Sequence, residues 1–165
     1  MAINDLAHQL GVELLRLGRR VTTAESCTGG GIAAAITEVA GSSAWFDAGF
    51  VTYSNEQKHL MLGVPMLLFE QVGAVSREVV EAMATGAQQR AQADYAVAVS
   101  GVAGPGGGTP DKPVGTVWIA WAAGEQCYSR VYLFAGDRHA VRQATVHQAL
   151  SGLLALCRNE NPIQG

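Results

Sequence analysis

The chain has 165 residues, of which 48% are hydrophobic and 15% charged, and its formal net charge is -3 at pH 7. With only 11 Lys and Arg it lacks the basic surface that a nucleic-acid duplex or an anionic membrane would require. The three cysteines, Cys27, Cys127 and Cys157, are widely spaced and form no CxxC pair, so the sequence supports neither a disulfide framework nor a zinc ribbon. We therefore expect one domain over 1–165, with a core over about 5–157, in the reducing cytoplasm and without a membrane-spanning segment.

Hydrophobic spacing and capping residues predict the elements in chain order. A helix over 3–17 ends at Gly18, and it is followed by a strand over 20–24, a helix over 32–36 and a strand over 49–53. Further along we expect a helix over 55–62, a short helix before Gly73, a helix from Ser76 to about 91, a strand over 94–100, two strands over 115–121 and 127–134, and a helix over 138–157. This alternation predicts an α/β fold, a single three-layer α/β/α sandwich whose late hairpin makes the sheet mixed. The small apolar helices and the low charge favour a homo-oligomer, with a dimer as the first expectation.

The turn between the first strand and the next helix is rich in hydroxyls and glycines. It contains Glu25, Ser26, Thr28, Gly29 and Gly30. Backbone N–H groups at a helix start attract anions, and glycines let a ligand approach the backbone. The alternative is an ordinary capped turn with Ser26 or Thr28 as the cap, and this segment alone favours neither interpretation.

Three polar loops follow predicted strands, over 25–30, 53–58 and 100–113. Because ligands of α/β proteins gather at the carboxyl ends of strands, these loops are expected to converge on one pocket. The third loop contains Ser100 and Gly104 but neither the ending of a P-loop nor a GxGxxG followed by a helix. Its glycines are equally compatible with a structural and a functional role.

Lys58 lies in the opening turn of a helix capped by Ser54, where the helix dipole lowers the pKa of an ammonium. A lysine that acts as a base near neutrality needs its pKa lowered by about 3, which demands burial or another cation. Most helical lysines are solvated surface residues. Ser43 and Tyr53 likewise have ordinary interpretations, as a turn residue and as a half-buried packing residue.

Arg138 and Arg142 lie four residues apart on one predicted helix face, a spacing that can clamp a phosphate or carboxylate. Surface ion pairs with Asp137 or Glu125 are the alternative. The four histidines show neither HxH nor HExxH spacing, so we expect no metal site.

Several long motifs in a fixed order resemble the CinA C-terminal family, and the likeness covers about residues 5 to 155. They are TAESCTGG over 23–30, GFVTYSNEQK over 49–58, GAVS over 73–76, SGVAGPGG over 100–107, KPVGTV over 112–117 and FAGDR over 134–138. Gly31 departs from the larger residue expected at that position.

This resemblance implies an amidohydrolase that converts nicotinamide mononucleotide into nicotinic acid mononucleotide and ammonia in NAD salvage, with no metal or cofactor. It also implies a catalytic group of Ser43, Tyr53 and Lys58. In our hypothesis Ser43 attacks the carboxamide while neutral Lys58 takes its proton, directly or through Tyr53. The substrate phosphate would lie at the 26–30 helix start or in the 104–108 loop, with Arg138 or Arg142 adding charge.

Two alternatives remain. The same domain occurs in longer competence- and damage-inducible proteins, so the chain could be a non-catalytic module that binds a pyridine nucleotide or an ADP-ribose-like ligand. In the other, Cys27 is the nucleophile, because a helix N-terminus lowers the pKa of a thiol.

Overall fold

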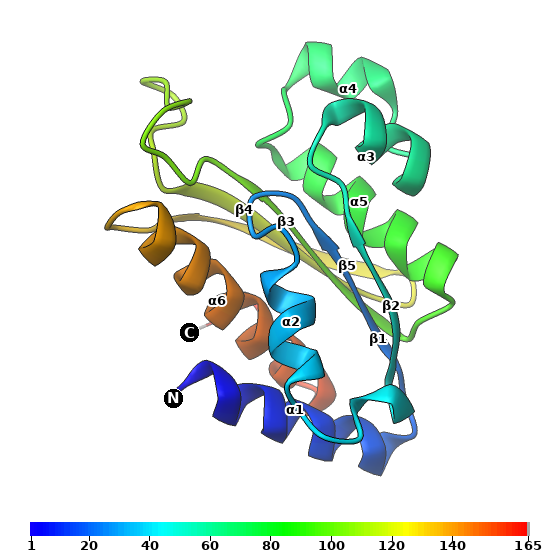
Figure 1. Ribbon diagram of the computed structural model, residues 1–165. Helices are drawn as coiled ribbons and strands as arrows, with labels where there is room; N and C mark the ends of the chain where they lie inside the picture. The colour runs from blue at the N-terminus through cyan, green and yellow to red at the C-terminus, as the bar shows by residue number, and fades with distance from the viewer. Residues whose placement is uncertain (165) are drawn as a thin grey trace.

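The computed structural model describes residues 1–164. Its centre is a five-stranded sheet with the strand order β2-β1-β3-β4-β5 (Figure 1). The strands are β1 (Val21–Glu25), β2 (Phe46–Val51), β3 (Tyr95–Gly101), β4 (Thr116–Ala123) and β5 (Gln126–Leu133). β1 runs parallel to β2 and β3, whereas β4 is antiparallel to β3 and β5. The predicted α/β fold with a mixed sheet is confirmed.

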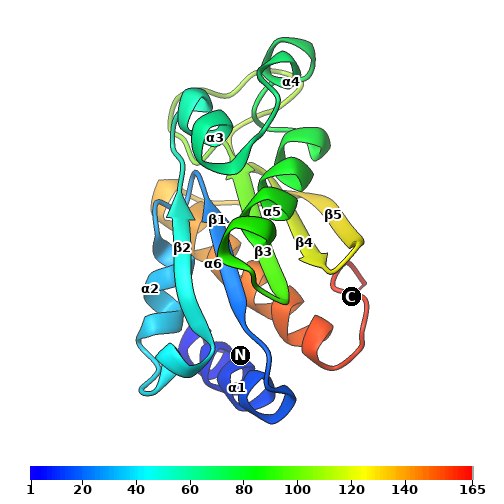
Figure 2. The ribbon, with the colours of Figure 1, turned by 90° about the vertical axis from the view of Figure 1, so that its right-hand side faces the viewer.

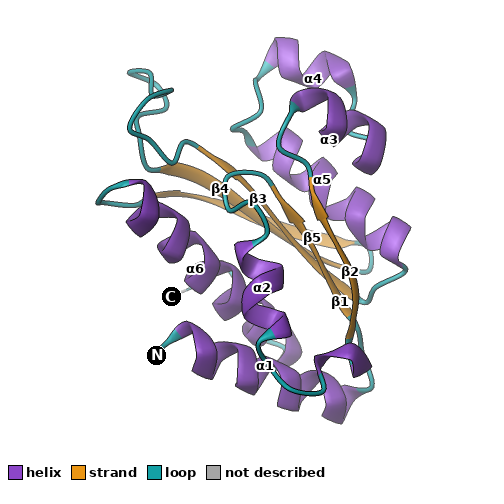
Figure 3. Cartoon of the chain, viewed as in Figure 1, coloured by secondary structure: helices purple, strands orange, loops and turns teal. Residues whose placement is uncertain are grey.

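Helices cover both faces of this sheet (Figures 2 and 3). One face carries α1 (Ile3–Leu17), α2 (Gly31–Thr37) and α6 (Arg138–Cys157), and the other carries α3 (Asn55–Leu62), α4 (Met66–Gln71) and α5 (Arg77–Ala91). Side chains of β3 alternate between the two faces, as a pleated strand requires. Val97 and Val99 pack in the core with α6, while Ala96 and Ala98 pack in the core with α5.

Local capping explains why most elements begin and end where the sequence predicts. Gly18 ends α1 in a left-handed conformation with a φ of 65°. The Ser54 hydroxyl accepts a 3.1 Å hydrogen bond from Gln57 N, and the Asp137 carboxylate accepts one of 2.9 Å from Ala140 N. The largest difference is β2, which begins at Phe46 rather than at the predicted position 49.

The parallel strands β1, β2 and β3 all end at one edge of the sheet and all begin at the other. We call the edge where β1, β2 and β3 end, at Glu25, Val51 and Gly101, the carboxyl edge, and the edge where they begin the amino edge. In the strand register Glu25 lies beside both Val51 and Val99. The loops that leave these three strands therefore start side by side.

Candidate active site

A cavity of about 220 Å³ lies at the carboxyl edge, where the three predicted loops converge. Its lining comes from Ser26, Cys27, Tyr53, Asn55, Lys58, Ala74, Val75, Ser100, Gly101, Ala103 and Arg138. The cavity thus combines two serine hydroxyls, an amine, a phenol and a guanidinium that come from segments far apart in the sequence.

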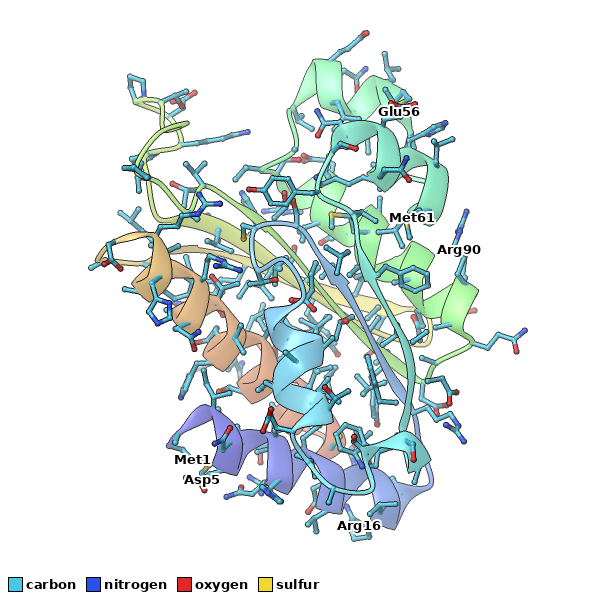
Figure 4. The ribbon with its side chains drawn as sticks, viewed as in Figure 1. Met1, Asp5, Arg16, Glu56, Met61 and Arg90 are labelled. Carbon is cyan, nitrogen blue, oxygen red and sulfur yellow. The ribbon has the colours of Figure 1, made fainter. Side chains whose placement is uncertain are left out.

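Lys58 is the most unusual group in this cavity. Its residue is only 1% exposed, since α3 turns Lys58 and Leu62 inward while Glu56 and Met61 stay on the outer surface of the helix (Figure 4). The ammonium donates a 2.9 Å hydrogen bond to the carbonyl of Tyr53, and neither of the two ion pairs found within residues 1–164 includes it. Burial lowers the pKa of Lys58 from 10.5 to about 8. A neutral amine is therefore accessible near physiological pH.

Ser26 is the first residue after β1 and opens into the same cavity. Its N–H donates to Val99 O at 3.2 Å, and its carbonyl accepts from Gly29 N at 3.0 Å. Within residues 1–164 the hydroxyl of Ser26 makes no hydrogen bond, and the N–H groups of Cys27 and Thr28 donate none to another residue. A hydroxyl without a hydrogen-bond partner and two backbone N–H groups that donate to no other residue therefore lie in one short turn.

The start of α2 is not free to bind an anion, which is one of the two interpretations that the sequence of this segment allows. The buried carboxylate of Glu25 accepts hydrogen bonds from Thr28 Oγ1 at 2.5 Å, from Ile32 N at 2.8 Å and from Ala33 N at 3.0 Å. A carboxylate of the chain itself thus occupies the helix start, and a second anion would be repelled there. Glu25 and Thr28 hold the turn together instead of lining the cavity.

The two glycines of this turn also shape it rather than line the cavity. Gly29 and Gly30 have φ values of 57° and 102°, which side chains with a Cβ rarely adopt. At Gly31 a Cβ would come within 3.2 Å of Val146 Cγ2, so the small residue relieves packing between α2 and α6.

Ser43 lies at the opposite edge of the sheet from Lys58. It is an exposed residue of a short 3-10 helix, Ser42–Ala44, that precedes β2, whereas Tyr53 and Lys58 follow β2. Five residue steps along an extended strand measure about 16 Å. The structure therefore contradicts the expected proton transfer between Ser43 and Lys58.

Arg138 lies at the rim of the cavity and connects two of its loops. From the first position of α6, its guanidinium donates to Gly104 O at 2.7 Å and to the Tyr53 hydroxyl at 3.1 Å. Ser100, at the end of β3, donates its hydroxyl to Ala74 O at 2.9 Å. The Tyr53 hydroxyl thus contacts Arg138, while the Tyr53 carbonyl contacts Lys58.

Arg142 has a different environment one turn further along α6. It donates from Nε to Cys27 O at 3.1 Å and from a terminal nitrogen to Thr28 O at 3.0 Å, and it does not line the cavity. The two arginines therefore do not form the joint anion clamp that their spacing allows. Only Arg138 faces the site.

The Cys27 thiol lies in the wall of the cavity and is buried. Burial raises the pKa of Cys27 from 9.0 to about 11, so the thiol is protonated at neutral pH. A protonated thiol is a poor nucleophile, and this geometry disfavours Cys27 as the attacking group.

Larger clefts occur elsewhere on the molecule. One of about 390 Å³ at the amino edge is lined by Arg19, Tyr95 and Glu160 among others. The smaller cavity around Lys58 is the better candidate, because it holds a buried amine whose pKa is lowered toward neutrality. Among the described residues no cluster of His, Cys, Asp and Glu is suited to a metal ion, and no helix is long and apolar enough to cross a membrane.

Comparisons with known proteins converge on one family. The model of the CinA C-terminal domain matches residues 3–157. The chain is 65% identical over 154 residues to nicotinamide-nucleotide amidohydrolase PncC of Pseudomonas putida, covering 93% of this chain and 96% of that protein. It is 54% identical over 150 residues to the protein of the same name from Escherichia coli strain K12, covering 90% and 91% of the two chains.

A solved structure shows the same fold. The competence/damage inducible protein CihA from Agrobacterium tumefaciens superposes with a TM-score of 0.91 at 48% identity, covering 93% of this chain and 94% of that chain. Longer relatives also exist: a CinA-like protein of Akkermansia muciniphila is 54% identical over 142 residues, which are 34% of its length.

Proposed function

Because this chain belongs to the CinA C-terminal domain family, we propose that it is an amidohydrolase that converts nicotinamide mononucleotide into nicotinic acid mononucleotide and ammonia, in pyridine nucleotide salvage. One observation carries the proposal: a buried lysine with a pKa near 8 shares a cavity with an unengaged serine hydroxyl. Hydrolysis of an amide through a serine needs this pairing of a weak nucleophile with a base.

In the proposed reaction Ser26 replaces Ser43 as the nucleophile. Neutral Lys58 takes the proton of the Ser26 hydroxyl as Oγ bonds to the carboxamide carbon and forms a tetrahedral intermediate. The C–N bond then breaks, and ammonia leaves with the proton returned by Lys58. Water attacks the resulting ester, giving a proton to Lys58, which passes it to Ser26 Oγ as the carboxylate product forms.

The negative oxygen of the intermediate needs donors that are already in position. The N–H groups of Cys27 and Thr28 donate no hydrogen bond to another residue within residues 1–164 and belong to the turn that carries Ser26. Removing one prearranged donor of this kind from a serine hydrolase costs about 3 kcal/mol of transition-state stabilisation. We assign the oxyanion to them.

The substrate phosphate is assigned to Arg138 and the loop that begins at Gly104. Glu25 already occupies the start of α2, and Arg142 is engaged with carbonyls of the turn. Arg138 is the guanidinium that lines the cavity, and it can exchange its bond to the Tyr53 hydroxyl for one to a phosphate. Tyr53 then closes the cavity beside the bound nucleotide.

The test is ammonia release by the purified protein from nicotinamide mononucleotide. We expect turnover with this substrate. An Arg138→Gln variant should raise KM by about 10- to 100-fold and change kcat less, because a charge-assisted contact to the phosphate is lost. Nicotinamide riboside, which lacks the phosphate, should show no such difference between the two proteins.

Binding of the nucleotide without ammonia release would contradict this proposal and favour the alternative, a non-catalytic module for a pyridine nucleotide or an ADP-ribose-like ligand.

We further propose a cytoplasmic homodimer. Exposed Leu60 and Leu67, 59% and 58% accessible on α3 and α4, support a subunit contact there. Size-exclusion chromatography with light scattering measures the mass, and a monomer would contradict it.

A further inference from the structure

We propose that Arg142 is a positioning residue for the proposed reaction: its guanidinium fixes and polarises the Cys27–Thr28 peptide so that the adjacent N–H groups can donate to the oxyanion. This inference rests on the proposed function, in which Ser26 is the nucleophile. It gives a role to an arginine that lies outside the cavity but contacts the turn behind it.

Peptide geometry determines where the donors of this turn point. In a planar trans peptide the C=O and the N–H point in opposite directions. Arg142 draws the carbonyl of Cys27 toward itself, so the N–H of Thr28 points away from Arg142. The carbonyl of Ser26 accepts from Gly29 N, and the N–H of Cys27 therefore points away from Gly29. Both N–H groups donate to no other residue and remain beside the Ser26 hydroxyl.

Arg142 is the side chain that holds the carbonyls of Cys27 and Thr28 in place. Within residues 1–164, Cys27 O and Thr28 O accept side-chain hydrogen bonds only from Arg142, at 3.1 and 3.0 Å. Glu25 holds the opposite side of the turn through Thr28 Oγ1 and the first N–H groups of α2. The donors of the turn are thereby fixed before substrate arrives, which is the condition for strong electrostatic catalysis.

Positive charge at the carbonyls also strengthens the donors. A hydrogen bond from a charged group polarises the amide it reaches, and polarised chains of hydrogen bonds reinforce one another. The fork of a guanidinium can reach two carbonyls at once, whereas an ammonium is a point donor on a flexible stem. A lysine at position 142 should therefore support only part of the wild-type kcat.

The experiment compares steady-state ammonia release from nicotinamide mononucleotide by wild type, Arg142→Gln, Arg142→Lys and Arg158→Gln. Arg158 is a matched control because it caps the other end of α6, hydrogen bonded to the partly exposed side chain of Gln9. We expect Arg142→Gln to lower kcat by about 100-fold and to leave KM within about twofold. Arg142→Lys should lose about tenfold in kcat, and Arg158→Gln should match wild type.

The separate effects on kcat and on KM, together with the pH profile, tell whether Arg142 positions the oxyanion donors or only stabilises the fold. For Arg142→Gln the inflection of kcat/KM against pH should stay at its wild-type position, since Lys58 is unchanged. A wild-type kcat per folded molecule, or a raised KM with unchanged kcat, would overturn the inference. If Arg142→Gln does not fold, Arg142→Lys decides alone, and a wild-type kcat for it would overturn the inference.

A Ser26→Ala control tells failure of this inference apart from failure of the proposed function. If Ser26→Ala stays active, the proposed nucleophile is wrong. If Ser26→Ala is inactive while Arg142→Gln keeps wild-type kcat, the nucleophile stands and only the role of Arg142 is refuted.

Discussion

The two edges of the sheet carry similar groups but very different environments. The carboxyl edge has Ser26 and the hydrogen-bonded pair of Arg138 and Tyr53, and the amino edge has Ser43 and the hydrogen-bonded pair of Arg19 and Tyr95. A cleft at the amino edge, of about 390 Å³, is also larger than the cavity around Lys58, of about 220 Å³. A serine, an Arg–Tyr pair or a large cleft volume therefore does not by itself identify the active site, because both edges have these features.

The buried amine of Lys58 is what separates the two edges. At the carboxyl edge the sequence places a lysine on the inner face of α3 with one carbonyl partner and no carboxylate partner within residues 1–164. Desolvation of this kind costs stability, so it marks a group kept for its chemistry. Arg19 at the amino edge is exposed, and contact with Tyr95 raises its pKa, so it stays charged.

Replacing Lys58 with methionine should have the largest effect on kcat, and it tests the difference between the two edges. We expect Lys58→Met to lower kcat by about 1000-fold or more, because the base is removed. We also expect a gain of up to about 3 kcal/mol in the free energy of unfolding at pH 7, the equivalent of the lowering of the Lys58 pKa from 10.5 to about 8.

The direction in which the free energy of unfolding changes with pH follows from proton binding. The unfolded chain binds more protons than the folded one between pH 8 and pH 10.5, so wild-type stability should rise with pH across that window, and the burial cost of Lys58 is fully present below it. Urea unfolding at several pH values measures both effects. A less stable Lys58→Met variant would contradict the account, and Arg19→Met, at the amino edge, should leave kcat unchanged.

The pH dependence of the wild-type enzyme is the next largest expected effect. Only neutral Lys58 can accept the serine proton, so kcat/KM should rise about tenfold per pH unit below the pKa and level off above it. The inflection should lie near the Lys58 pKa of about 8. Initial rates across the range give the profile, and a rate that is flat from about pH 6 to pH 9 would refute Lys58 as the base.

The smallest expected effect is that of Cys27. Because burial raises the pKa of this thiol to about 11, Cys27→Ala should keep kcat within about threefold of wild type. Slow alkylation by iodoacetamide at neutral pH would agree with a protonated thiol. Complete loss of turnover in Cys27→Ala would instead point to a cysteine nucleophile.

The fold and the convergence of the loops could be predicted because they depend on local rules. Helix caps at Gly18, Ser54 and Asp137 and the period of buried residues fix the elements, and parallel strands bring their following loops together. The same rule argues against Ser43, which precedes β2 and so lies at the amino edge. The resemblance to the CinA C-terminal family nevertheless implies Ser43, because motif similarity does not take the direction of the strands into account.

The remaining errors concern which partner each polar group takes. Sequence shows a glycine-rich helix start but not that the Glu25 carboxylate, seven and eight residues before the backbone donors Ile32 and Ala33, occupies it. The spacing of Arg138 and Arg142 places both on neighbouring turns of α6. It does not reveal that one guanidinium faces a cavity and the other faces carbonyls, because these contacts depend on distant segments.

The most direct test of the account compares Ser26→Ala with Ser43→Ala, measuring the turnover number for ammonia release from nicotinamide mononucleotide above the Lys58 pKa of about 8. The two variants remove the same atom at opposite edges of the sheet. We predict that Ser26→Ala loses about 1000-fold or more in kcat and that Ser43→Ala stays within about twofold of wild type. An active Ser26→Ala variant together with an inactive Ser43→Ala variant would contradict the account.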